Sequence, residues 1–266
     1  MLFSEPMSDA WERRYGFPAP ADLPELRTLL NHRSVRNFKA EPVSERMMEA
    51  LVAAGQSAST SSNLQLWSVV SVQEPERREK IAELCAGQKQ VREAAWFLAF
   101  LADTHRLAEA ARTRGLDPAG LDYIEFYTMA VIDAALAAER MVCAAESLGL
   151  GVCYIGALRN DPYGVQEFLR LPKGTFGTFG LCIGWPSDEE RAAIKPRLRQ
   201  EAIWFRESYP DQVDVSEYDE RMKPSYARRG VEGDWSSHSG RRVDGEHMTG
   251  RNRLRAFLEE QGFNHR

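Results

Sequence analysis

The chain has 266 residues, of which 43% are hydrophobic and 27% charged, with 39 acidic and 34 basic side chains. These values are typical of a soluble globular protein and, at about 150 residues per domain, predict one or two domains. The net charge of −5 argues against general nucleic-acid binding. No stretch approaches the roughly 20 uncharged apolar residues of a membrane helix, and the N-terminus lacks the basic and apolar regions of a signal peptide.

We therefore expect a cytoplasmic protein that binds neither nucleic acid nor membranes. The cysteines favour a reducing compartment, because they lie far apart in apolar stretches and form no C-x-x-C pair. They are Cys85, Cys143, Cys153 and Cys182.

Two basic windows interrupt this acidic chain, and neither contains an acidic residue. The first, between residues 25 and 41, contains Arg27, Arg33, Arg36 and Lys39. The second, between residues 190 and 201, contains Arg191, Lys195, Arg197 and Arg199. The pattern predicts one small anion site assembled from distant segments, or alternatively two solvated basic faces.

The first half of the chain alternates helical and strand patterns. Asp22 and Pro24 predict the start of a helix that runs to about residue 30, and Ser44 predicts the N-cap of a second helix. Residues 57–62 are a loop pattern, and residues 67–72 are a strand pattern. Residues 76–95 look helical with a break near Gly87, and the apolar run 96–102 predicts a strand buried on both faces.

The second half begins with an alanine-rich helical pattern over 121–149, which predicts a central buried helix or one at a subunit contact. A strand at 152–155, a helix at 162–170 and a strand at 179–185 follow. Beyond residue 200, the acidic stretch 207–220 and a glycine-rich stretch predict an extended arm that ends in a helix at about 251–261. The alternation of strands and helices predicts an α/β or α+β sheet core.

The segment HRSVRNF at 32–38 is the sharpest local motif, because its guanidinium, hydroxyl and imidazole groups suit a phosphate monoester. The alternative is a helix whose last turn carries cations that complement its dipole. The glycines at 149, 151 and 156 do not form a dinucleotide fingerprint, since they follow a helix and precede a strand. The five scattered histidines predict no metal site.

Six segments in order resemble the nitroreductase superfamily of FMN-dependent oxidoreductases, most closely its oxygen-insensitive, NADPH-using nitroreductase and flavin reductase subgroup. They are HRSVRNF at 32–38, STSSNLQLW at 59–67, AGQ at 86–88, AAESLGLGVCYIGALRN at 144–160, FGLCIGWP at 179–186 and KPRL at 195–198. The resemblance implies an α+β fold, with a mixed sheet flanked by helices, in an intertwined homodimer with FMN at each subunit interface. It divides the chain into an N-terminal extension (1–22), an FMN-binding domain (23–205) and a C-terminal arm wrapping the partner subunit (206–266).

The resemblance also implies roles for individual residues. FMN would be held at its phosphate and ribityl chain by His32, Arg33, Ser34, Val35 and Arg36, with Lys195 and Arg197 closing the phosphate site. The flavin would be lined by Thr60, Ser61 and Asn63 of the partner subunit, and its polar edge by Gln88. Backbone groups near flavin N5 and O4 would come from Tyr154, Ile155, Gly156 and Ala157.

The implied reaction is hydride transfer from NAD(P)H through flavin N5 to an electron-poor acceptor, such as a nitroaromatic, a quinone or free flavin, in a ping-pong sequence. Because the cofactor carries the chemistry, no catalytic side chain is expected. Arg229 would contact the NADPH 2′-phosphate, but the acidic residues that follow leave the choice between NADPH and NADH open.

Two alternatives remain. The same fold and cofactor serve dehalogenation, flavin fragmentation or heterocycle oxidation in similar enzymes. A non-catalytic anion-binding protein would instead use Arg228, Arg229, Arg241 and Arg242.

Overall fold

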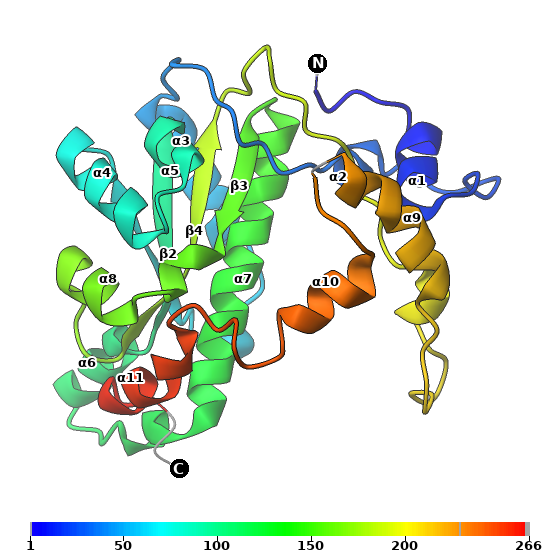
Figure 1. The fold of residues 1–266 in the computed structure, drawn as a ribbon. Helices are drawn as coiled ribbons and strands as arrows, with labels where there is room; N and C mark the ends of the chain where they lie inside the picture. The colour runs from blue at the N-terminus through cyan, green and yellow to red at the C-terminus, as the bar shows by residue number, and fades with distance from the viewer. Residues whose placement is uncertain (1, 229, 264–266) are drawn as a thin grey trace. The chain divides into compact units, whose positions relative to one another are not determined.

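The computed structural model describes residues 2–228 and 230–263 (Figure 1). Its internal contacts divide the chain into two compact units. We call Met1–Arg33 with Ala193–Met248 the helical unit, and Ser34–Ala192 with Thr249–Arg266 the sheet unit.

The sheet unit is built on four strands in the order β1-β2-β4-β3. They are β1 (Trp67–Val72), β2 (Trp96–Asp103), β3 (Gly151–Ile155) and β4 (Thr175–Gly184). All three pairs of neighbouring strands are antiparallel, so the prediction of a mixed sheet is wrong for these four strands. Among the described residues, parallel pairing is limited to an isolated bridge between Ser34 and Val152. The helices that follow β1 and β3 bring the chain back to the end of the sheet at which that strand finished. The next strand therefore runs in the opposite direction, so β2 is antiparallel to β1 and β4 is antiparallel to β3.

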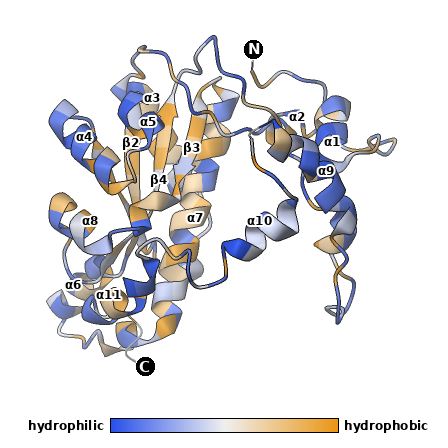
Figure 2. Cartoon of the chain, viewed as in Figure 1, coloured by the Kyte–Doolittle hydropathy of each residue, from blue (hydrophilic) through white to orange (hydrophobic). Residues whose placement is uncertain are grey.

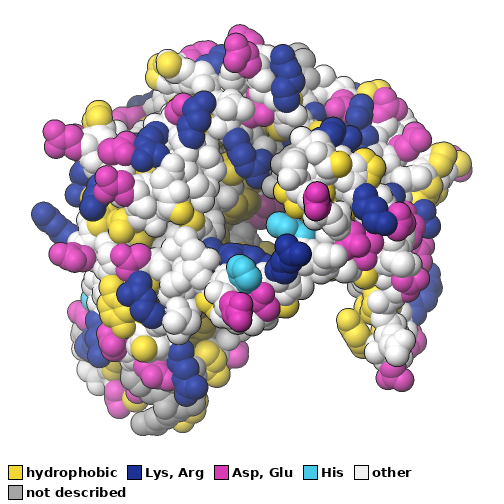
Figure 3. Space-filling model, in the orientation of Figure 1, with side chains coloured by type: hydrophobic (Ala, Val, Ile, Leu, Met, Phe, Trp, Pro, Cys, Tyr) yellow, Lys and Arg dark blue, Asp and Glu magenta, His cyan; other side chains and the backbone are white. Residues whose placement is uncertain are grey.

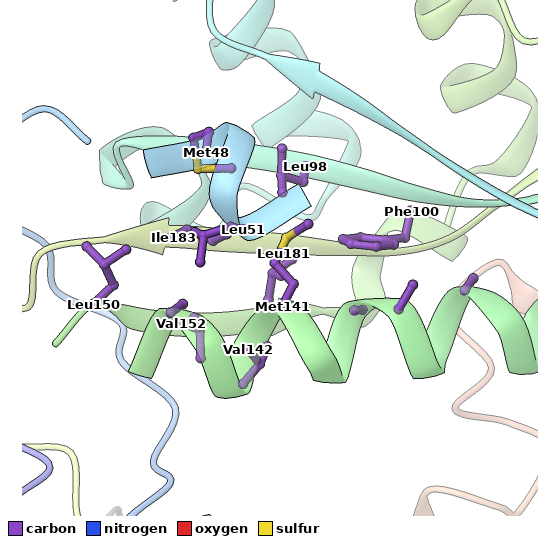
Figure 4. Packing of buried hydrophobic residues seen from close by; sticks show 14 of the residues in the cluster. Met48, Leu51, Leu98, Phe100, Met141, Val142, Leu150, Val152, Leu181 and Ile183 are labelled. Carbon is purple, nitrogen blue, oxygen red and sulfur yellow. The ribbon is translucent and has the colours of Figure 1, made fainter. Parts of the chain in front are cut away.

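One face of the sheet is covered by α7 (Ile124–Ser147) and α3 (Glu45–Gln56), and the main apolar core lies between these layers. Figure 4 shows Met141 of α7 and Leu181 of β4 beside each other in this core. The buried alanines of α7 allow the close approach, since they add little volume between helix and sheet. The predicted cap at Ser44 is confirmed: its side chain accepts a hydrogen bond from the backbone N–H of Met47.

The other helices of this unit include α4 (Pro75–Leu84) and α8 (Pro162–Leu169), which pack on β1 and β4 respectively. Glycines in β4 make room for neighbouring side chains; a Cβ at Gly180 would lie only 2.5 Å from the Phe97 ring. Strands β2, β3 and β4 are largely hydrophobic along their length (Figure 2), and β2 is buried on both faces as predicted. Further elements are η1 (Ser61–Asn63), α5 (Lys89–Glu93), α6 (His105–Thr113), η2 (Ala119–Asp122) and η3 (Gly156–Arg159).

The C-terminal segment from Thr249 onward belongs to the sheet unit of its own chain. It contains η5 (Arg251–Arg253) and α11 (Leu254–Glu260). Phe257 and Phe263 are fully buried and pack in a cluster with Leu66 and Phe176. The wrapping of a partner subunit by residues 206–266 remains a prediction, but the last part of that segment is an integral piece of this core.

The helical unit contains α1 (Met7–Tyr15), α2 (Arg27–Leu30), η4 (Gln200–Ala202), α9 (Ser216–Ala227) and α10 (Trp235–Arg241). The helix expected from Asp22 is shorter than predicted, because Asp22 adopts φ +64, a left-handed conformation that an N-cap does not use. Helix α9 replaces the extended arm expected here. Its apolar side, formed by Tyr218, Met222 and Tyr226, packs with Trp235.

Within residues 2–228 and 230–263, no helix is long and apolar enough to cross a membrane, and no three His, Cys, Asp or Glu side chains gather as ligands for a metal ion. The four cysteines are free thiols; three are buried and Cys143 is partly exposed. Acidic and basic side chains are interspersed on the face of the molecule shown in Figure 3.

Candidate functional site

The two basic windows meet at one residue of the helical unit. The guanidinium of Arg14 in α1 donates to the carbonyl oxygens of Leu30 (2.9 Å) and His32 (3.1 Å). The carbonyl oxygen of Arg14 accepts the backbone N–H of Arg197 at 2.8 Å. The His32–Arg33 segment and the Lys195–Arg197 segment therefore both contact Arg14.

Arg33 is buried, and its guanidinium is already engaged. Its Nε donates to the Asn31 carbonyl, its Nη2 donates to Asn31 Oδ1, and its Nη1 forms an ion pair of 3.1 Å with Glu5. The expected direct contact between Arg33 and a phosphate stays a prediction. In this chain the guanidinium holds the backbone that precedes Ser34.

The continuation of the motif lies in the sheet unit, along β3. Ser34 bridges Val152, and the backbone N–H of Val35 donates to the Val152 carbonyl at 2.9 Å. A Cβ at Gly151 would lie 2.7 Å from Val35, so the glycine permits this approach. Arg36 is exposed, and its guanidinium donates to the Ser34 carbonyl at 3.3 Å. Ser34 and Arg36 thus supply a partly exposed hydroxyl and a cation.

Glu190 holds the backbone after Ser34 in place. Its Oε2 accepts the backbone N–H groups of Arg36 and Asn37, both at 2.8 Å. Burial alone would raise the pKa of this carboxyl, but the N–H groups of Asn37, Arg36, Arg191 and Ala192 together outweigh burial and lower it. The charged carboxylate therefore orients the Arg36 segment.

Lys195 and Arg197 are both exposed in the helical unit. The Arg197 backbone is fixed on both sides, by Arg14 at its N–H and by the Arg221 guanidinium at its carbonyl (2.8 Å). The Arg197 guanidinium donates to the neighbouring Pro196 carbonyl at 3.2 Å. A rigid backbone with an exposed guanidinium suits an oxyanion partner.

The polar loop with Thr60, Ser61 and Asn63 is held by the fully buried Asp133 of α7. One carboxylate oxygen of Asp133 accepts the Ser61 N–H and the other accepts the Leu66 N–H, both at 2.9 Å. Inside the loop three side-chain-bearing residues have left-handed backbones: Ser62 (φ 50), Asn63 (φ 56) and Gln65 (φ 53). Such conformations are costly and concentrate at functional sites, so the loop has a shape that Asp133 imposes.

The segment from Tyr154 to Ala157 leads from β3 into the short turn η3. Ile155 and Ala157 are buried, whereas Gly156 is partly exposed. The Tyr154 hydroxyl donates to Glu139 at 3.1 Å; burial, and then the Glu139 charge, raise the pKa of Tyr154. The first N–H groups of a helical turn have no acceptor within it, so η3 offers backbone donors next to Gly156.

Arg251, which none of the sequence motifs includes, contacts this segment. Arg251 donates from Nη2 to the Gly156 carbonyl (3.0 Å) and from Nε to Asn160 Oδ1 (3.1 Å). A Cβ at Gly156 would lie 3.6 Å from Arg159 Nη2 and 3.8 Å from Arg251 Nη2, so two guanidinium groups border this position. The cationic run at 251–255 was the available signal, but nothing in it points to Gly156.

Gln88 follows Ala86 and Gly87, both with left-handed backbones, and is the residue before helix α5. Its side-chain oxygen accepts a hydrogen bond of 2.6 Å from Gln90. Arg229, the expected nucleotide contact, lies outside the described residues.

Comparison with known proteins identifies the family. The nitroreductase family model matches residues 29–185, and the model of the nitroreductase family C-terminal domain matches residues 195–266. The chain therefore belongs to the nitroreductase family, as its motifs predicted.

Relatives cover nearly the whole chain. The oxygen-insensitive NADPH nitroreductase of Salmonella typhimurium is 37% identical over 245 residues, which are 90% of this chain and 98% of that protein. The FMN reductase (NADPH) of Bacillus subtilis is 33% identical with the same coverage. The solved structure of the NfrA1 nitroreductase from B. subtilis superposes with a TM-score of 0.84 at 33% identity, covering 91% of this chain and 99% of that one. The α+β fold is thus confirmed.

The donors described above fit FMN by their chemistry. In the sheet unit, the hydroxyl of Ser34 and the exposed Arg36 are donors of the kind that suit a phosphate monoester. In the helical unit, the exposed Lys195 and Arg197 are donors of the same kind. Gly156, with no side chain and with η3 beside it, leaves backbone groups accessible to a polar ring edge.

Proposed function

We propose that this protein is an FMN-dependent oxidoreductase that transfers reducing equivalents from NAD(P)H to electron-poor small molecules such as nitroaromatics, quinones or free flavin. The observation that supports this most is that His32 and Arg197, which belong to two cation-rich segments far apart in the sequence, both bind Arg14 in a chain of the nitroreductase family. The similar proteins, which include an NADPH nitroreductase and an FMN reductase, support the same reaction class.

At the phosphate end, Ser34, Arg36, Lys195 and Arg197 bind the FMN phosphate by charge-assisted hydrogen bonds. Arg33 acts indirectly, because its guanidinium is committed to Asn31 and Glu5. His32 and Val35 contribute to the same cofactor site, Val35 through its backbone.

At the ring end, Gln88 and the backbone of residues 154–157 meet the polar edge of the flavin. The chemistry that bound FMN supplies is transfer of a hydride from NAD(P)H through ring atom N5 to the acceptor. The guanidinium groups of Arg159 and Arg251 border Gly156 and add positive potential there, which favours negative charge on a bound ring. No side chain of this segment is assigned a proton-transfer role.

The nicotinamide and the acceptor use the same open face in turn, which gives a ping-pong sequence. Arg229 binds the nucleotide phosphate in this proposal. The protein acts in the cytoplasm on small molecules, without nucleic-acid or membrane partners.

The protein functions as a homodimer in which Thr60, Ser61 and Asn63 of one subunit line the flavin of the other. Exposed apolar side chains on α7 support this assembly. Ile132 and Leu136, one helical turn apart, are 49% and 43% exposed. A buried helix that presents large apolar side chains to solvent suits contact with a second subunit.

The decisive experiment is reconstitution. The purified chain, treated with FMN and desalted, is expected to retain visible flavin absorbance and to oxidise NADPH faster when a quinone is added. Parallel lines in initial-rate plots against both substrates would support the ping-pong sequence, and a screen of acceptors would distinguish nitroreduction from dehalogenation or heterocycle oxidation. A colourless protein that does not take up FMN would overturn the proposal.

A further inference from the structure

The N-terminal extension precedes the region that the family models match, which begins at residue 29. Its helix α1 carries Arg14, whose side chain is buried and holds the carbonyl oxygens of Leu30 and His32. These two bonds fix the backbone on either side of Asn31. Charged donors to carbonyls are stronger than neutral hydrogen bonds, so this is a firm attachment.

The same residue is attached to the second basic segment through its backbone. The Arg14 carbonyl accepts the N–H of Arg197 (2.8 Å) and Nη1 of Arg221 (2.7 Å). Arg221 also donates through Nη2 to the Arg197 carbonyl at 2.8 Å. Gly16, with φ +76, makes room for this arginine, since a Cβ there would lie 2.5 Å from Arg221 Cδ. Both backbone groups of Arg197 are therefore held from α1 and α9.

A second attachment lies at the start of the extension. The side chain of Asn31, fully buried, pairs with the backbone of Glu5: the Glu5 N–H donates to Asn31 Oδ1 (3.1 Å), and Asn31 Nδ2 donates to the Glu5 carbonyl (2.9 Å). The Glu5 carboxylate then neutralises the buried Arg33. The extension thus binds the first basic window at two places, through Arg14 and through Glu5.

We propose that the N-terminal extension sets the spacing between the two cationic segments of the phosphate site, and that Arg14 is the positioning residue that joins them. This inference rests on the proposed function, because the phosphate is that of FMN. Arg14 itself does not touch the ligand. Its side chain binds the carbonyl oxygen of His32, and its own carbonyl oxygen binds the N–H of Arg197. Arg14 alone therefore sets the distance between the His32–Arg33 segment and the Lys195–Arg197 segment.

The test separates phosphate recognition from general folding. Full-length apoprotein is titrated with FMN and with riboflavin, which shares the ring and the ribityl chain but lacks the phosphate. The wild type is expected to bind FMN more tightly. Arg14→Gln is expected to weaken FMN binding about tenfold, equivalent to about 1.4 kcal/mol, while riboflavin binding stays within about twofold.

The neighbouring Arg13 gives a matched control. Its side chain is 58% exposed and pairs with Oε2 of Glu5 at 2.7 Å, whereas Arg33 pairs with Oε1. Arg13→Gln is expected to keep the wild-type ratio of FMN to riboflavin affinity. Arg14→Lys, which keeps the charge but has one donor group in place of a fork, is expected to give an intermediate ratio.

An unchanged affinity ratio in Arg14→Gln, or an equal loss of both ligands, would overturn this inference. If Arg14→Gln does not fold, Arg221→Gln removes the bonds to the carbonyls of Arg14 and Arg197 and is judged by the same ratio. If the wild type itself binds FMN no better than riboflavin, the phosphate site fails, and the proposed function is rejected separately from the role of Arg14.

Discussion

Arg251, near the C-terminus, donates a hydrogen bond of 3.0 Å to the carbonyl oxygen of Gly156, at the end of β3. The bond ties the C-terminal segment to the turn that the proposal places beside the flavin ring. Because a peptide carbonyl and its N–H point in opposite directions, fixing the Gly156 carbonyl also fixes the direction of the Ala157 N–H.

Arg251→Gln is expected to weaken this attachment and to lower the free energy of unfolding by about 1 to 2 kcal/mol, since Arg251 is only partly buried. In FMN-loaded protein it is also expected to lower the flavin reduction potential, because a positive charge near Gly156 is lost. Arg253→Gln is the control: Arg253 lies two residues on and pairs with Asp161 at 3.4 Å. Equal potentials in the two variants would contradict the assigned role.

Asp133→Asn tests the shape of the polar loop. Each carboxylate oxygen of Asp133 accepts one backbone N–H, and an amide offers only one oxygen, so the substitution leaves one buried donor without an acceptor. We expect a loss of about 1 to 3 kcal/mol in the free energy of unfolding, measured by urea denaturation. Glu125→Gln, at an exposed position on the same helix, is expected to change it little. Wild-type stability in Asp133→Asn would show that the loop does not depend on this carboxylate.

The Glu190 carboxyl predicts a dependence on pH. Its pKa is lower in the folded protein than the ordinary value of 4.5, so its charged form stabilises the fold above pH 4.5. That contribution is lost as the pH falls through the folded-state pKa. Glu190→Gln is expected to be less stable than the wild type at pH 7, and the difference is expected to shrink as the pH falls below the ordinary value of 4.5. Chemical denaturation of both proteins at several pH values measures it; a difference that grows toward acid would refute the assignment.

Ile132→Glu tests the assembly. A carboxylate at this exposed position of α7 costs the monomer little, because the side chain is about half exposed. It is expected to shift the mass in solution from dimer to monomer, as measured by light scattering. Glu125→Gln again serves as the control. If the wild type is monomeric, or if Ile132→Glu stays dimeric, this face of α7 is not the subunit contact.

Much of the sheet unit was predictable from local patterns. The apolar runs at 67–72 and 96–102 and the alanine-rich stretch at 121–149 each correspond to an observed element, because their burial is written in the residue types. Strand direction was not predictable, since it depends on where the helices between strands return. The helix at 216–227 was missed because Pro224 lies inside it, where proline usually ends a helix, and because its apolar residues are spaced among polar ones.

The site shows a similar division. The cationic segments and the polar loop were found from residue types, and the structure adds the contacts that hold them. Arg14, Asp133 and Arg251 act through backbone groups of residues distant in the chain, and local patterns carry no signal of such partners. Local patterns also do not show that Arg33 pairs with Glu5, because Glu5 lies 28 residues away in the sequence.

The buried thiol of Cys85 has a practical consequence. It lies at the end of α4, directly before the turn Ala86–Gly87 that leads to Gln88, and burial raises its pKa to about 12. Thiol reagents attack the thiolate, so at neutral pH this cysteine reacts only when the turn opens. The rate at which a thiol reagent modifies Cys85, followed by mass spectrometry of the intact chain, therefore measures how often this turn opens. A bound ligand that contacts Gln88 is expected to slow the modification.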